Sequence, residues 1–109
     1  MIRVEALWLS TEPLDMRAGS DKALARVVQV FGSAVPHHAY GFANRRADRM
    51  KVLVHDGIGV WLAARRLNVG RFVWPGAGET LSLTREQFDA LVLGLPWQRI
   101  GHAGIIRVL

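Results

Sequence analysis

Two apolar-rich runs, Arg49–His55 and Ile58–Arg66, flank the dipeptide Asp56-Gly57. An Asp-Gly pair in this setting is typical of a β-hairpin with a two-residue type I′ turn, in which both central residues need positive φ. Such a turn would place His55 opposite Ile58, and so would fix which side chains share each face of the ribbon. One face is then nearly all apolar and should meet the helices: Met50, Val52, Val54, Gly59, Trp61, Ala63 and Arg65.

The other face of this hairpin is apolar near the turn and basic at the open end. Its members are Arg49, Lys51, Leu53, His55, Val60, Leu62, Ala64 and Arg66. A two-stranded ribbon has the width of a DNA major groove, and arginine and lysine contacts to phosphate position many DNA-binding proteins. The hairpin is therefore a candidate nucleic-acid-binding element.

Two amphipathic helices are predicted on either side of the strand-rich centre. Four apolar residues at helical spacing indicate the first helix, over residues 20–31: Leu24, Val27, Val28 and Phe31. Ser20 could cap its start, and Gly32 could end it in the left-handed conformation. Thr84 and Gln87 form a capping box that opens a second helix, which Gly94 and Pro96 should end. Its apolar stripe is Phe88, Leu91, Val92 and Leu95.

Further short strands are predicted at residues 4–9, 39–43, 71–74 and 80–83. Short loops between consecutive strands favour an antiparallel meander. The predicted class is α+β, an antiparallel meander sheet with two amphipathic helices packed on one face. The residues expected in the core are Leu24, Val27, Val28, Phe31, Val52, Val54, Trp61, Phe88, Leu91 and Val92.

The length of 109 residues suits one domain, residues 1–109, whose last segment (98–109) is either an added edge strand or frayed. The chain has no cysteine, which fits a reducing cytosol and removes disulfides and zinc–thiolate sites. No apolar stretch is long enough for a signal peptide or a membrane span. A cytoplasmic protein without membrane contact is therefore expected.

The basic side chains are concentrated in the centre of the chain. Seven of the 14 basic residues, but only two of the nine acidic ones, lie between Arg45 and Arg71, so this segment carries the whole net charge of +5. Arginine binds phosphate in a bidentate manner, and basic patches mark nucleic-acid-binding surfaces. The candidate nucleic-acid-binding residues are Arg45, Arg46, Arg49, Lys51, Arg65, Arg66 and Arg71, with Trp74 a candidate for stacking on bases.

Several motifs in order along the chain carry a resemblance to one family. They are Asp15-Met16-Arg17-Ala18-Gly19-Ser20-Asp21, Phe42-Ala43-Asn44-Arg45-Arg46-Ala47-Asp48-Arg49-Met50-Lys51-Val52-Leu53, His55-Asp56-Gly57-Ile58-Gly59, Arg65-Arg66-Leu67, Gly70-Arg71-Phe72-Val73-Trp74-Pro75, and Leu83-Thr84 with Leu91, Gly94 and Trp97. From about residue 4 to residue 97 the chain resembles the Orf-two or TnpB-type accessory proteins of insertion-sequence family sixty-six.

The resemblance implies a small bacterial protein that assists a separate, larger transposase and carries no catalytic residues. The expected function is that of a non-catalytic accessory factor for transposition and DNA recombination, which binds the DNA of the element ends through the basic hairpin. The transposase and other proteins of the element are expected partners. The alternative is a protein-interaction module that docks on the transposase without touching DNA. The oligomeric state stays open.

The acidic and histidine residues do not form the pattern of a catalytic or metal site. A nuclease needs carboxylates that hold two metal ions, but Asp56 belongs to the turn and Asp48 lies among arginines where it should be paired. The adjacent His37 and His38 would point to opposite faces of a strand, which makes joint metal binding awkward. No metal, cofactor or enzymatic activity is therefore predicted.

Overall fold

The computed structural model describes residues 3–76, 78 and 80–100. Its elements follow in the order β1 (Ala6–Leu9), α1 (Ser20–Phe31), β2 (His38–Ala43), β3 (Arg49–His55), β4 (Val60–Arg66), β5 (Leu81–Leu83), α2 (Arg85–Val92) and the 3-10 helix η1 (Trp97–Arg99). This confirms the α+β class and both predicted helices. The predicted strand at residues 71–74 does not form, and the final residues 101–109 lie outside the described part.

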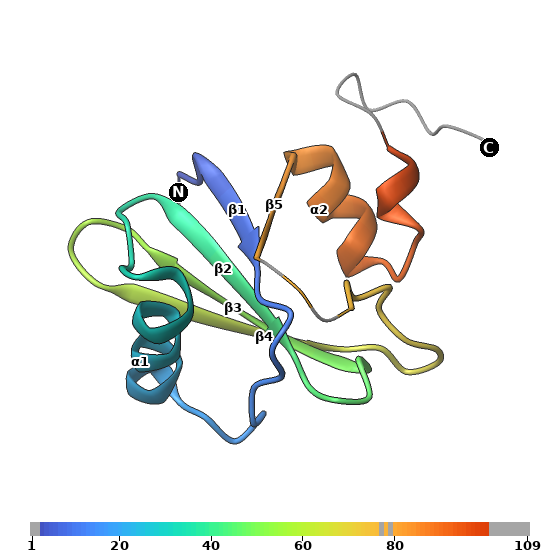
Figure 1. The fold of residues 1–109 in the computed structure, drawn as a ribbon, viewed down its shortest axis with the longest axis horizontal. Coiled ribbons are helices and arrows are strands. Elements are labelled where there is room, and N and C mark those ends of the chain that lie inside the picture. The colour runs from blue at the N-terminus through green and yellow to red at the C-terminus, as the bar shows by residue number, and fades with distance from the viewer. Residues whose placement is uncertain (1–2, 77, 79, 101–109) are drawn as a thin grey trace.

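The five strands form one mixed sheet in the order β4-β3-β2-β1-β5 (Figure 1). The segment β2-β3-β4 is the expected antiparallel meander, and β5 returns antiparallel to β1. The pair β1–β2 is parallel, which corrects the purely antiparallel prediction. Because α1 lies between these two strands in the sequence, the chain crosses over and re-enters the sheet in the same direction.

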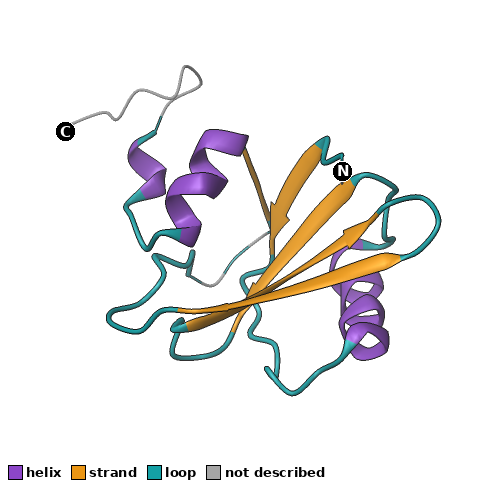
Figure 2. Cartoon of the chain, turned by 180° about the vertical axis from the view of Figure 1, so that it is seen from behind, coloured by secondary structure: helices purple, strands orange, loops and turns teal. Residues whose placement is uncertain are grey.

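The two helices pack on opposite faces of the sheet, so their predicted placement on one face is wrong. Helix α1 contributes Ala23 and Val27 to a core with Tyr40, Phe42 and Leu53. Helix α2 contributes Ala90 and Leu91 to a separate core on the other face of the sheet. The sheet residues in this core include Leu7, Leu9, Ala39 and Met50. Figure 2 shows the twisted sheet from behind, with the two helices at opposite ends. A single sheet thus supports two small cores.

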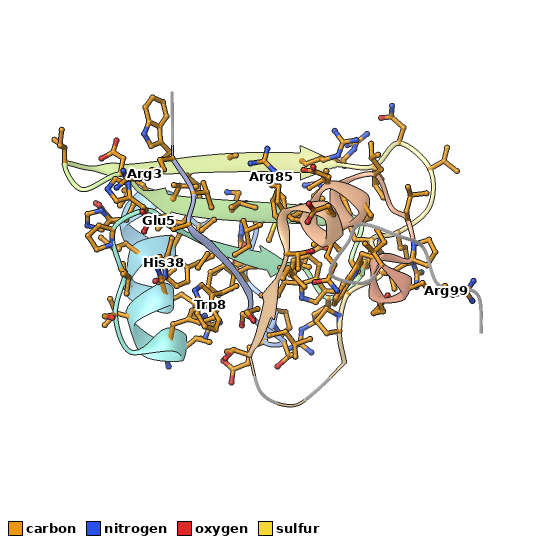
Figure 3. All side chains as sticks on the ribbon, turned by 90° about the horizontal axis from the view of Figure 1, so that it is seen from above. Arg3, Glu5, Trp8, His38, Arg85 and Arg99 are labelled. Carbon is orange, nitrogen blue, oxygen red and sulfur yellow. The ribbon has the colours of Figure 1, made fainter. Side chains whose placement is uncertain are left out.

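Aromatic rings fill the core beneath α1. The ring centroid of Phe31, at the end of the helix, lies 4.9 Å from that of Tyr40. It lies 6.1 Å from the ring centroid of Phe42, in an edge-to-face arrangement. Trp8 of β1 donates its indole N–H to Nδ1 of His38 at 3.1 Å, and the two rings lie together beside α1 (Figure 3). His38 is therefore engaged in the packing of the sheet on α1, where it accepts this hydrogen bond.

The hairpin between β3 and β4 has a longer loop than predicted. His55 pairs with Val60, which leaves residues 56–59 in the loop. One carboxylate oxygen of Asp56 accepts hydrogen bonds from the backbone N–H groups of Ile58 and Gly59, at 2.9 and 2.7 Å. This Asx-type cap holds a four-residue loop with positive φ at Gly57 but not at Asp56. The register differs from the predicted one by two residues, so every side chain stays on its predicted face.

The Asp56 carboxylate also makes stability depend on pH. Hydrogen bonds from Gly59, Ile58 and the Trp61 indole lower the pKa of Asp56 to about 2. A carboxyl with a lowered folded-state pKa stabilises the fold above its unfolded pKa, and this contribution is lost as the pH falls toward the folded value. We expect wild type to be more stable than Asp56→Asn near neutral pH, with the difference shrinking between about pH 4 and pH 2. Chemical unfolding over this range measures it, and a pH-independent difference would contradict the assignment.

The expected core is correct in part. Of the predicted core residues, Val27 and Leu91 are buried. Six others are half-buried: Leu24, Phe31, Val52, Val54, Phe88 and Val92. Val28 is exposed, and Trp61 is 54% exposed because it lies on the edge strand β4, beyond the part of the sheet that α2 covers. Trp97, Phe72 and Tyr40, none of them predicted, are buried instead.

Candidate nucleic-acid interface

The loop between β2 and β3 carries the first two arginines of the basic segment at its tip. Asn44 at the base of the loop bonds the backbone of Arg49 in both directions, and its side chain donates to Asp48 Oδ1 at 2.7 Å. The backbone N–H of Phe72 donates to the carbonyl of Ala47 at 2.7 Å, which ties the segment of Arg71 to the same loop. These bonds tie the loop backbone to its own base and to the segment of Arg71, while Arg45 and Arg46 remain exposed.

A second wall faces this loop, formed by the segment from Glu12 to Arg17. Its backbone is fixed to the end of β2, where Leu14 N–H donates to the carbonyl of Ala43 at 2.9 Å. Lys51 Nζ donates to the carbonyl of Ala18 at 2.7 Å and holds the far end of the segment against the sheet. Between the two walls lies a hollow of about 800 Å³, lined on the loop side by Asn44, Arg45, Arg46 and Arg49.

Two smaller hollows continue this one, and the three share arginines. A hollow of about 270 Å³ lies between Arg45, Arg46, Arg71 and Trp74. Another, of about 360 Å³, lies between Met16, Arg49, Lys51 and Arg66 and reaches Arg65 at the sheet edge. We call the continuous depression the basic groove and define it by Arg45, Arg46, Arg49, Arg66 and Arg71.

Charge in the basic groove is strongly unbalanced. Within residues 3–76, 78 and 80–100, none of the groove arginines lies within ion-pair distance of a carboxylate. Asp48 was expected to pair with arginine, but its carboxylate accepts from Asn44 instead. That bond, more than the nearby Arg49 and Arg46, lowers the pKa of Asp48.

The two acids on the opposite wall have partners of their own. Asp15 binds Arg17 at 2.8 Å, and this hydrogen-bonded pair lowers the pKa of Asp15 to about 2. Glu12 lies 3.8 Å from Arg26. These two acids are therefore neutralised by arginines outside the groove, and the groove arginines determine its positive charge. Arg17 and Arg26 were not among the predicted site residues, because Asp15 and Glu12 balance their charge in the sequence.

The predicted site residues fall into three groups. Arg45, Arg46, Arg49, Arg66 and Arg71 line the groove and are exposed. Lys51 is half-buried and bonded to Ala18, and Arg65 points to the other face, where its Nε donates to the carbonyl of Val92. Trp74 borders the groove but packs against the α2-side core, and its indole donates to the carbonyl of Ser10 at 2.8 Å. Its position is explained by packing on Gly41, where a Cβ atom would lie 3.6 Å from the ring.

Comparison with known proteins decides the family. The family model described as "IS66 Orf2 like protein" matches residues 5–102, nearly the whole chain. The chain belongs to the IS66 Orf2-like family. Two proteins of Sinorhizobium fredii are similar: y4hO, 33% identical over 94 residues (84% of this chain and 82% of y4hO), and y4jC, 32% identical over 107 residues (93% and 88%). No solved structure matches the chain.

Membership of the IS66 Orf2-like family assigns the chain a transposition-associated accessory role, in a family that is not a known catalytic one. In the part of the chain that the structure describes, no three His, Cys, Asp or Glu side chains are grouped to hold a metal ion. No helix among the same residues is long and apolar enough to cross a membrane.

Proposed function

We propose that this IS66 Orf2-like protein is a non-catalytic accessory factor that binds the DNA of the element ends through the basic groove. The observation that carries the proposal is the set of exposed arginines in the groove without carboxylate partners among the described residues. Like charges held close together repel, which costs stability. Bound phosphate offsets that repulsion and is the simplest ligand for such a surface.

The form of the groove favours contact with the sugar–phosphate backbone. Arg45 and Arg46 lie on a loop whose backbone is fixed by hydrogen bonds at both ends. Binding therefore needs to order little of the loop backbone, which lowers its entropic cost. Guanidinium groups bind phosphate oxygens bidentately, and such contacts fix a protein on DNA without reading its sequence. We therefore expect similar affinity for element-end and random duplexes in the absence of other element proteins.

The proposal is tested by the salt dependence of binding. Neutralising several phosphates releases counterions, so the logarithm of affinity should fall linearly with the logarithm of salt concentration, by about 0.9 per phosphate contacted. Arg46→Ala should weaken binding equally on all sequences and reduce this slope by about one unit. Fluorescence anisotropy with labelled duplexes over a salt series measures both quantities.

Arg85→Ala is the matched control, because it removes one arginine on α2 (Figure 3) that already pairs with Asp89 at 3.0 Å. It should leave the slope unchanged. Affinity that does not change with salt, or equal effects of the two substitutions, would remove the basic groove as a DNA site.

A second candidate function is docking on the transposase. It is favoured by the exposed apolar residues Leu93 and Leu95, which follow α2 on the sheet face opposite Arg49 and Arg66. A complex with the transposase that survives nuclease treatment and is lost in Leu93→Ser would support docking. Loss of the complex on nuclease treatment would assign the contact to DNA.

A further inference from the structure

The two edges of the sheet differ in how they are protected. The edge strand β5 has three residues, whereas β4 at the opposite edge has seven and, within residues 3–76, 78 and 80–100, pairs with β3 alone. The pairing of β3 with β4 runs without interruption from Arg49–Arg66 to His55–Val60, so no bulge distorts the edge. Strand β4 contains no proline. A long, regular and open edge is a template for another strand.

The free backbone groups of β4 can be identified from the ladder. Bonds from Asp56 N–H to Gly59 and from Leu67 N–H to Asp48 mark the hydrogen-bonded pairs of this antiparallel ribbon. Because hydrogen-bonded and non-hydrogen-bonded pairs alternate, Trp61, Ala63 and Arg65 bond to β3. Val60, Leu62, Ala64 and Arg66 therefore present their N–H and C=O groups outward.

We propose that β4 pairs antiparallel with β4 of a second copy of this chain, about a two-fold axis at Ala63. This pairing joins two sheets into one and goes beyond the proposed DNA binding. In this register Leu62 lies opposite the second copy's Ala64, and Val60 opposite its Arg66, so the outward backbone groups meet each other. Ala63 lies opposite itself in a non-hydrogen-bonded pair.

The side chains of β4 are complementary to a second copy in this register. No arginine lies opposite another arginine, whereas a two-fold axis at Arg65 would force such a contact. Trp61 lies opposite the second copy's Arg65, and a guanidinium over an indole is a favourable cation–π pair. The interface thereby covers an indole that the single chain leaves 54% exposed. In each copy Arg65 donates to the carbonyl of Val92 at the end of α2. The pairing therefore also places the end of the second copy's α2 next to Trp61.

A two-fold axis perpendicular to the sheet keeps equivalent faces on the same side. Both basic grooves would then face one way. In this register Arg66 of one copy lies opposite Val60 of the other, six residues from the other copy's Arg66. The two Arg66 Cα atoms would therefore be roughly 20 Å apart along the strands.

A cysteine at the axis tests the pairing directly. The chain has no cysteine of its own. In a non-hydrogen-bonded antiparallel pair the Cα atoms are about 4.5 Å apart, which a disulfide spans. With glutathione disulfide as oxidant, Ala63→Cys should form a covalent dimer at micromolar protein concentration. Ile58→Cys, at the most exposed position of the hairpin loop, is the matched control and should cross-link at least tenfold more slowly.

The mass in solution gives an independent readout. By light scattering the wild type should show twice the chain mass of 12.1 kDa. Ala63→Lys and Ala63→Glu each set like charges opposite each other, so each should show the single-chain mass, and their mixture should recover the dimer. A wild-type mass of 12.1 kDa at all concentrations would overturn the proposal. So would equal cross-linking of the two cysteine variants, or a dimer that survives both charge substitutions.

Discussion

Replacing Leu91 with alanine should lower the free energy of unfolding by about 2–5 kcal/mol. Leu91 is 0% exposed and lies where α2 meets the side chains of Leu9 and Met50 on the sheet. Removing the three carbons beyond Cβ would leave a cavity, because the sheet and the helix are both fixed by other contacts. Urea unfolding monitored by tryptophan fluorescence measures the loss.

Leu93→Ala is the control on the same segment. Leu93 is 61% exposed, so the identical chemical change there should cost less than about 1 kcal/mol. Equal losses for the two substitutions would mean that α2 does not pack on the sheet face that we describe. The comparison should be made at low protein concentration, so that association does not contribute.

Reversing the charge of the groove loop should have the largest effect on DNA binding. Arg45→Glu combined with Arg46→Glu removes two phosphate contacts and adds two repulsive charges, so we expect affinity to fall about 100-fold or more at low salt. Both side chains are exposed and make no hydrogen bond to any other described residue, so the melting temperature should stay within a few degrees of wild type.

Arg85→Glu is the control for this double substitution, since it changes the net charge on α2 without altering the groove. It should retain most of the wild-type affinity. If the double variant bound DNA as tightly as wild type while transposition in cells was lost, the groove would contact a protein partner instead.

Local patterns predicted much of the fold. Helix α1 spans the predicted residues and ends before Gly32, but its N-cap is Gly19, so the predicted cap by Ser20 is wrong. The capping box of Thr84 and Gln87 forms as expected. The faces of the β3–β4 hairpin were correct although its loop was two residues too short, because a shift of two residues keeps each side chain on the same face. Side-chain periodicity alone carries this information.

The arrangement of the elements in space was less accessible. Periodicity shows that a helix has an apolar face but does not say which side of the sheet it meets, so α1 and α2 were wrongly placed together. Trp61 shows the same limit, because an apolar face at the edge of a sheet is covered only as far as the helix reaches. The parallel pair β1–β2 followed from the helix between them, which the loop-length argument overlooked.

The candidate site was predictable to the extent that its residues are near in sequence. Arg45, Arg46 and Arg49 belong to one hairpin loop, so their clustering follows from the chain itself. The opposite wall, with Arg17 and Arg26, comes from a distant segment whose charge is balanced by Asp15 and Glu12. The bond from Lys51 to Ala18 is also a long-range contact that no local pattern indicates.

The most direct test of DNA binding by the basic groove is to map where DNA touches the protein. Titration of nitrogen-15-labelled protein with an element-end duplex should shift the amide resonances of the loop 44–49, of Arg66 and of Arg71. The amides of residues 85–92 in α2 should shift much less, since this helix packs on the sheet face opposite Arg49 and Arg66. Shifts confined to α2 or to the α2-facing side of the sheet, or no shifts at low salt, would contradict the basic groove as the DNA site.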